Sequence, residues 1–97
     1  MRKSGSVAVL AAAVFLSAAA SAAPIPPQQD KAGALLKYQV LTPPDRRATL
    51  DAFMGRKLSD GAFTALDACT LRQATEDNAG RVKLSATITA CAKETGN

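Results

Sequence analysis

The first 22 residues limit how much of the chain can form a folded core. A basic start at Arg2 and Lys3 precedes an apolar run over residues 7–20, and small residues follow up to Ala22. This order is typical of a signal peptide that is removed after export. The apolar run is shorter than the roughly 20 residues that span a bilayer, so we expect no stable membrane anchor after cleavage. We place the cut after Ala22, because cleavage one residue later would put Pro24 against the cut bond.

Removal of residues 1–22 would leave a short chain with a thin core. Residues 23–97 keep 10 of the 12 basic residues against 8 acidic ones, so the net charge falls from +4 to +2. A chain so close to neutrality attracts nucleic acid or an anionic membrane only weakly. Its aromatic residues are Tyr38, Phe53 and Phe63. Domains of about 75 residues usually need a constraint besides their core to stay folded.

Cys69 and Cys91 can supply that constraint. An even pair of cysteines in an exported chain is expected to form a disulfide. Closing a loop of this size stabilises the fold by about 3 kcal/mol if chain entropy dominates. A redox pair would more often be spaced C-x-x-C, and a metal site would need further ligands, which a chain without histidine supplies only as carboxylates. We predict a structural disulfide, with no metal and no cofactor.

The chain after the signal peptide divides into an arm and one domain. Residues 23–29, APIPPQQ, carry three prolines. Proline fixes φ and lacks a backbone donor, so this segment is predicted to be an extended arm that joins no core. Residues 30–95 are predicted to form a single small domain.

Two helices are predicted in the first half of that domain. Over residues 30–41, apolar residues recur at near-helical intervals at Ala32, Leu35, Leu36 and Val40, after a candidate cap at Asp30. Over residues 43–54 the signals are stronger, because a capping threonine and two prolines precede the apolar face and a glycine follows it; these are Thr42, Pro43, Pro44 and Gly55.

A third helix is predicted over residues 60–76. Ser59 is its candidate cap, and Leu58 and Phe63 have the spacing of a hydrophobic staple. Its helical stripe places Cys69 on the apolar side. Asp67 falls away from that stripe and is therefore expected on a solvated face.

Residues 81–91, RVKLSATITAC, fit two structures. Alternation of apolar and polar residues favours a strand, as do the β-branched residues Thr87, Ile88 and Thr89. Helical spacing instead places Cys91 beside Leu84 and Ile88. A lone strand after a helix would lack a pairing partner, so we favour the helix. The predicted fold is all-α, a small bundle of three to four short helices with one disulfide.

Little in this sequence indicates catalysis. Without histidine there is no Ser-His-Asp or Cys-His arrangement and no imidazole metal ligand. The carboxylates are scattered, and a short chain leaves little room for a pocket that would raise the pKa of a general acid. We therefore do not expect an enzyme.

The most suggestive surface feature is a pair of basic dipeptides. Arg46-Arg47 and Arg56-Lys57 flank the helix predicted over residues 43–54 and form a candidate partner-binding edge. Neighbouring carboxylates favour an ordinary solvated surface instead. Nucleic acid is not an expected partner, because few aromatic side chains are present to stack on bases.

These observations define a class of protein rather than one activity. We expect a small exported protein of the bacterial envelope, periplasmic or extracellular, with a binding or structural role toward another envelope or secreted protein. One alternative is a stress chaperone that holds unfolding proteins, although few carboxylates and no histidine argue against a simple acid switch. Another is an inhibitor or immunity protein that binds a single partner protein.

Overall fold

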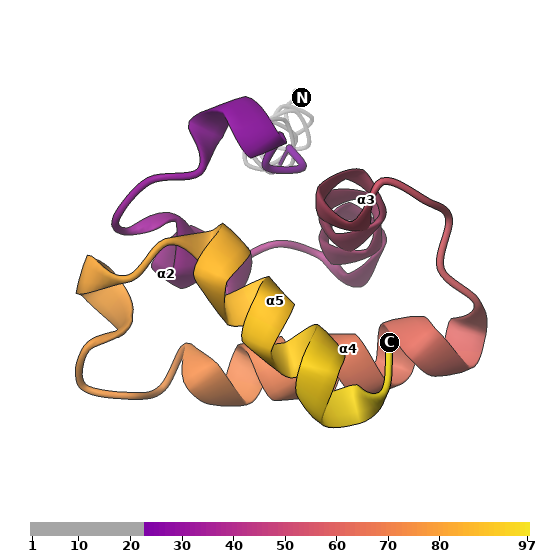
Figure 1. Ribbon diagram of the computed structural model, residues 1–97. Coiled ribbons are helices and arrows are strands. Elements are labelled where there is room, and N and C mark those ends of the chain that lie inside the picture. The colour runs from indigo at the N-terminus through magenta and orange to yellow at the C-terminus, as the bar shows by residue number, and fades with distance from the viewer. Residues whose placement is uncertain (1–22) are drawn as a thin grey trace, which may run out of the picture.

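Residues 23–97, the part of the chain that the computed structural model describes, contain four α-helices and two short 3₁₀ turns (Figure 1). The elements are η2 (Pro27–Gln29), α2 (Ala34–Tyr38), α3 (Pro43–Met54), α4 (Asp60–Gln73), η3 (Ala79–Arg81) and α5 (Leu84–Thr95). No strand occurs among these residues. The predicted all-α bundle of three to four helices with one disulfide is confirmed. The predicted signal peptide, residues 1–22, lies outside the described residues.

Helices α3 and α4 begin where their caps were predicted. The Thr42 hydroxyl accepts a hydrogen bond from the Asp45 amide at 3.4 Å, and the Ser59 hydroxyl accepts one from the Ala62 amide at 3.2 Å. Helix α3 ends at Gly55, whose φ of 72° is the left-handed conformation that favours glycine. Helix α4 ends at Gln73, three residues before the predicted end.

The ambiguous segment near the C-terminus is a helix. Helix α5 buries one side of its surface at helical spacing, at Leu84, Thr87, Ile88 and Cys91. In Figure 1, α5 crosses over α4, and within residues 23–97 these two helices pack against each other more extensively than any other pair of elements. The strand interpretation of residues 81–91 is therefore excluded. The helix starts only at Leu84, because residues 79–81 form η3.

Helix α2 is shorter than predicted. It covers residues 34–38 of the range 30–41, because Gly33 precedes it with a left-handed φ of 96°. Its buried side consists of Ala34, Leu35 and Tyr38. Leu36 and Val40, which the apolar pattern grouped with Leu35, are exposed instead.

The structure corrects the expectation that residues 23–29 join no core. Ile25 is only 5% exposed and belongs to the hydrophobic core. Its amide donates a hydrogen bond to the Thr49 hydroxyl on α3 at 3.0 Å. Residues 27–29 turn as η2 rather than continuing as an extended arm. Ile25 therefore attaches this segment to α3, through its buried side chain and through the hydrogen bond from its amide.

Candidate functional site

The disulfide joins α4 to α5 inside the bundle. Cys69 and Cys91 are bonded, with their Cα atoms 5.7 Å apart. Both residues are buried, so neither sulfur is readily accessible to a dissolved thiol. The predicted disulfide is confirmed. It suggests an oxidising compartment outside the cytoplasm, because disulfides rarely persist in reducing ones.

A buried polar cluster connects α2, α3 and α4. The Tyr38 hydroxyl donates a hydrogen bond to the Asp67 carboxylate at 2.6 Å. Arg46 donates to both oxygens of the same carboxylate, from Nε at 2.9 Å and from Nη2 at 3.2 Å, and donates from Nη1 to the Leu41 carbonyl at 2.9 Å. Two-point contact between a guanidinium group and a carboxylate holds both side chains in a defined geometry.

The pKa values of Tyr38 and Arg46 are both raised in this cluster. Burial, together with the hydrogen bond and the negative charge of Asp67, raises the pKa of Tyr38 above its ordinary range. The hydrogen bond to Asp67 raises the pKa of Arg46, against the opposing effect of burial. Tyr38 has no exposed surface, so its hydroxyl group is not available to a dissolved substrate. We therefore interpret the cluster as structural.

The position of Asp67 is a correction to the sequence analysis. This side chain was expected on a solvated face, yet Asp67 is only 8% exposed. It lies next to Leu66 and three residues before Thr70, at the margin of the buried stripe of α4. One signal could have indicated the burial: Tyr38 is a large apolar residue whose hydroxyl needs a partner when buried.

The structure separates the four residues of the predicted basic edge into two pairs with different surroundings. Arg46 points into the polar cluster. Arg47 donates to the Asp60 carboxylate at 2.8 Å and to the Leu58 carbonyl at 2.6 Å, and it lies 5.2 Å from the centre of the Phe63 ring. Two of the four basic side chains are thus already held by groups of the chain itself.

Arg56 and Lys57 are the exposed part of that edge. Arg56 makes a hydrogen bond of 3.4 Å to the Asn97 carbonyl, and neither residue forms an ion pair within residues 23–97. A role for Arg46, Arg47, Arg56 and Lys57 in binding a partner stays a prediction. If a partner binds this edge, Arg56 and Lys57 are its two exposed basic residues.

A small hollow lies between η2 and α2, on another part of the surface. Its volume is about 80 Å³. Its lining consists of Ile25, Gln29, Lys31, Ala32, Gly33, Ala34 and Lys37. We call it the lysine hollow, because its two charged residues are both lysines. The sequence did not predict this hollow, because the prolines indicated that residues 23–29 lie away from the helices.

Beside the lysine hollow, α2 and the turn that follows it expose apolar side chains. Leu36 is 41% exposed and Val40 is 75% exposed, and among residues 23–97 these are the exposed large hydrophobic residues. Val40 follows Leu36 by four residues in sequence, and Leu36 also approaches Gly80 in η3. We call the surface formed by Leu36 on α2 and by Val40, in the turn after α2, the α2 surface.

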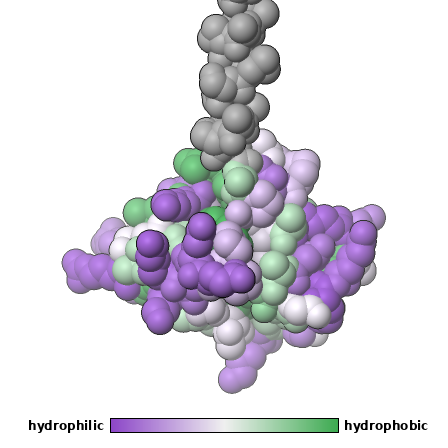
Figure 2. Space-filling model, turned by 90° about the horizontal axis from the view of Figure 1, so that it is seen from above, coloured by the Kyte–Doolittle hydropathy of each residue, from purple (hydrophilic) through white to green (hydrophobic). Residues whose placement is uncertain are grey.

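The rest of the described chain offers few other candidate sites. Seen from above, it is covered mostly by hydrophilic side chains, with hydrophobic residues in small separate areas (Figure 2). Residues 23–97 contain no cluster of three potential metal-ligating side chains, and no helix within them has the length and apolarity to cross a membrane. Comparison with protein-family models, with curated proteins and with solved structures found no match to this chain.

Proposed function

We propose that this chain is a small exported protein that binds a partner protein through the α2 surface. The observation that carries the proposal is the exposure of Leu36 on α2 and of Val40 in the turn that follows α2, whereas the other large hydrophobic residues of the described chain are buried or half-buried. Burial of such side chains against a partner would remove apolar surface from water and so favour association.

The charges around the α2 surface indicate what kind of partner fits. Four basic residues lie in the segments that border it, and none of them forms an ion pair within residues 23–97. These residues are Lys31, Lys37, Arg81 and Lys83. A partner segment with acidic and apolar residues would complement this surface. A second copy of the chain is less suitable, because symmetric pairing would place these positive charges against one another.

Export is the other part of the proposal. The disulfide supports an oxidising compartment, and the N-terminal pattern of residues 1–22 supports a cleaved signal peptide as the route. The bacterial envelope is the compartment we favour. There the bundle would act as a disulfide-stabilised binding protein.

Photo-crosslinking in a bacterial host tests both parts together. A photoreactive amino acid replaces Val40 in one variant and Thr64, an exposed residue of α4, in a matched control. We expect a discrete adduct at position 40, identified by mass spectrometry as a protein with an acidic segment, and none at position 64. Leu36→Glu in the Val40 variant should remove the adduct, because it adds negative charge to the contact.

The same preparation reports on export. Intact mass should correspond to residues 23–97 with both cysteines oxidised. Full-length chain in the cytoplasm would contradict export, and equal adducts at both positions, or none at either, would contradict binding through the α2 surface. An adduct between two copies of the chain would indicate self-association instead.

A further inference from the structure

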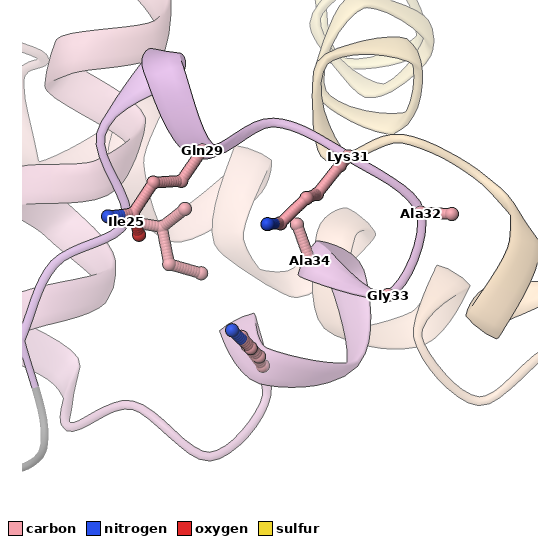
Figure 3. Close-up of a pocket in the computed structure, with 7 residues that line it drawn as sticks. Ile25, Gln29, Lys31, Ala32, Gly33 and Ala34 are labelled. Atoms are coloured by element: carbon pink, nitrogen blue, oxygen red, sulfur yellow. The ribbon is translucent and has the colours of Figure 1, made fainter.

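The lysine hollow combines two positive charges with an apolar floor. Lys31, Lys37 and the amide group of Gln29 are its polar lining, and Ile25 and Ala34 belong to its apolar lining. Figure 3 shows the Lys31 side chain reaching back over Ala34 toward Ile25. Neither lysine forms an ion pair within residues 23–97, so no carboxylate of the described chain is in direct contact with either ammonium group.

Residues in and next to the lysine hollow make hydrogen bonds to other helices of the bundle. Ile25 is fastened to α3 by the hydrogen bond from its amide to Thr49. Asp30, the acidic residue beside Lys31, accepts a hydrogen bond from the Ser85 amide at 3.1 Å. Its carboxylate is thereby directed to the start of α5. The acidic residue that is nearest in sequence to Lys31 is therefore already engaged.

We propose that the lysine hollow binds a carboxylate carried on a short aliphatic stem. Its volume of about 80 Å³ compares with roughly 300–1,000 Å³ for pockets that hold whole small molecules, so it suits one functional group. The inference rests on the proposed function: the group would be an aspartate, glutamate or C-terminal carboxylate of the partner that binds the α2 surface.

The lining favours a carboxylate over a phosphate. The methylene groups that precede a carboxylate can rest on Ile25 and Ala34, while its oxygens meet the ammonium groups of Lys31 and Lys37. Inorganic phosphate has oxygens on every side and no apolar part to cover this floor. Placing it there would remove water from a charged group without full compensation.

Nuclear magnetic resonance with small anions tests the hollow without the partner. Isotope-labelled protein, purified oxidised from the export host, is titrated with butyrate and separately with inorganic phosphate at constant low ionic strength. We expect butyrate to shift the amide signals of residues 31–37 in a saturable manner, and phosphate to bind more weakly. Lys31→Gln and Lys37→Gln should each weaken butyrate binding by roughly two- to fivefold, as expected for the loss of one exposed ion pair.

Lys57→Gln is the matched control, because it removes an exposed lysine at a distant edge of the molecule. The inference is overturned if the double variant Lys31→Gln/Lys37→Gln shifts as the parent does, if the shifts are spread equally around Lys57, or if butyrate causes none. Phosphate binding as tight as butyrate binding would overturn the choice of carboxylate. Failure here with a successful crosslink at position 40 would leave the α2 surface as the binding site without the carboxylate.

Discussion

At the scale of single residues, one buried carboxylate connects three helices. Burying a charge is costly unless it is paired and hydrogen-bonded, and Asp67 meets both conditions through Arg46 and Tyr38. The three residues come from three helices, so the contact can form only when α2, α3 and α4 are correctly placed. A network of this kind can favour one arrangement of the helices over others.

Tyr38 offers a direct test of that network, because it is the single tyrosine of the chain. Burial and Asp67 raise the pKa of Tyr38 in the folded protein above the unfolded value of about 10. The resulting stabilisation is complete below about pH 10 and is lost as the pH rises toward the folded pKa. We expect phenolate absorbance to appear only together with loss of the helical circular dichroism signal.

The control for this titration is a tyrosine at an exposed position. Val40→Tyr adds a second phenol on the α2 surface, where Val40 is 75% exposed, and this phenol should titrate near pH 10 while the helices persist. If Tyr38 itself ionised reversibly near pH 10 in the parent protein, with unchanged helical signal, the buried cluster would be contradicted.

At the scale of helices, caps that act within one turn of a helix end were predicted correctly from the sequence. Contacts between residues far apart in the sequence were missed. Helix α3 has the predicted bounds, because Thr42, the two prolines after it and Gly55 act within one turn of its ends. Helix α5 has no side-chain cap of its own at Lys83. Its first amides meet Asp30, which lies 55 residues from Ser85 in sequence. From the sequence, Asp30 was predicted to cap the helix that directly follows it. The structure shows that it instead accepts a hydrogen bond from the Ser85 amide at the start of α5.

Removing this long-range cap should destabilise the fold measurably. Asp30→Ala leaves the first turn of α5 without its acceptor, and we expect a loss of about 1 kcal/mol in the free energy of unfolding at neutral pH. Asp30→Asn keeps an acceptor without the charge and should lose less. Urea unfolding followed by circular dichroism measures both, with Asp77→Asn in the exposed α4–α5 connection as a control expected to change little.

The effect of Asp30 should depend on pH in one direction. Partial burial acts to raise the pKa of Asp30, but hydrogen bonds from Ser85 and Leu84, with the charge of Lys83, outweigh it and lower the pKa. A lowered folded pKa stabilises above the unfolded value of about 3.9, and this stabilisation disappears as the pH falls through the folded pKa. The difference between the parent and Asp30→Asn should therefore shrink below about pH 4. A difference that grew on acidification would contradict the contact.

At the scale of the whole molecule, the sequence predicted what holds the bundle together better than what it exposes. A core stabilised by a disulfide was predicted from the size of the chain, its few aromatic residues and its cysteine pair, and the structure has such a core. The α2 surface was not predicted, because Leu35 and Leu36 are equally apolar neighbours. Which of them is buried depends on how α2 meets η3 and α5, and these contacts are distant in sequence.

The contribution of the disulfide to the free energy of unfolding can be measured by comparing the oxidised and the reduced protein. Cys69 and Cys91 are 22 residues apart, and a closed loop of that length is worth about 3 kcal/mol through the entropy of the unfolded chain. Domains of this size have about 0.05–0.15 kcal/mol of stability per residue, so the disulfide would supply a large share of the total. The reduced protein should unfold at a clearly lower urea concentration than the oxidised protein.

A Cys69→Ala/Cys91→Ala variant separates loss of the cross-link from effects of the free thiols. It should unfold at low urea whether or not a reductant is present, whereas the parent should respond to reductant. Because the disulfide joins α4 to α5, and Asp67 on α4 is the hydrogen-bond partner of Tyr38, loss of this packing should also expose Tyr38 and allow it to ionise near its ordinary pKa. Equal unfolding midpoints for the oxidised and reduced parent would show that packing alone holds the helices, and that the disulfide is dispensable for the fold.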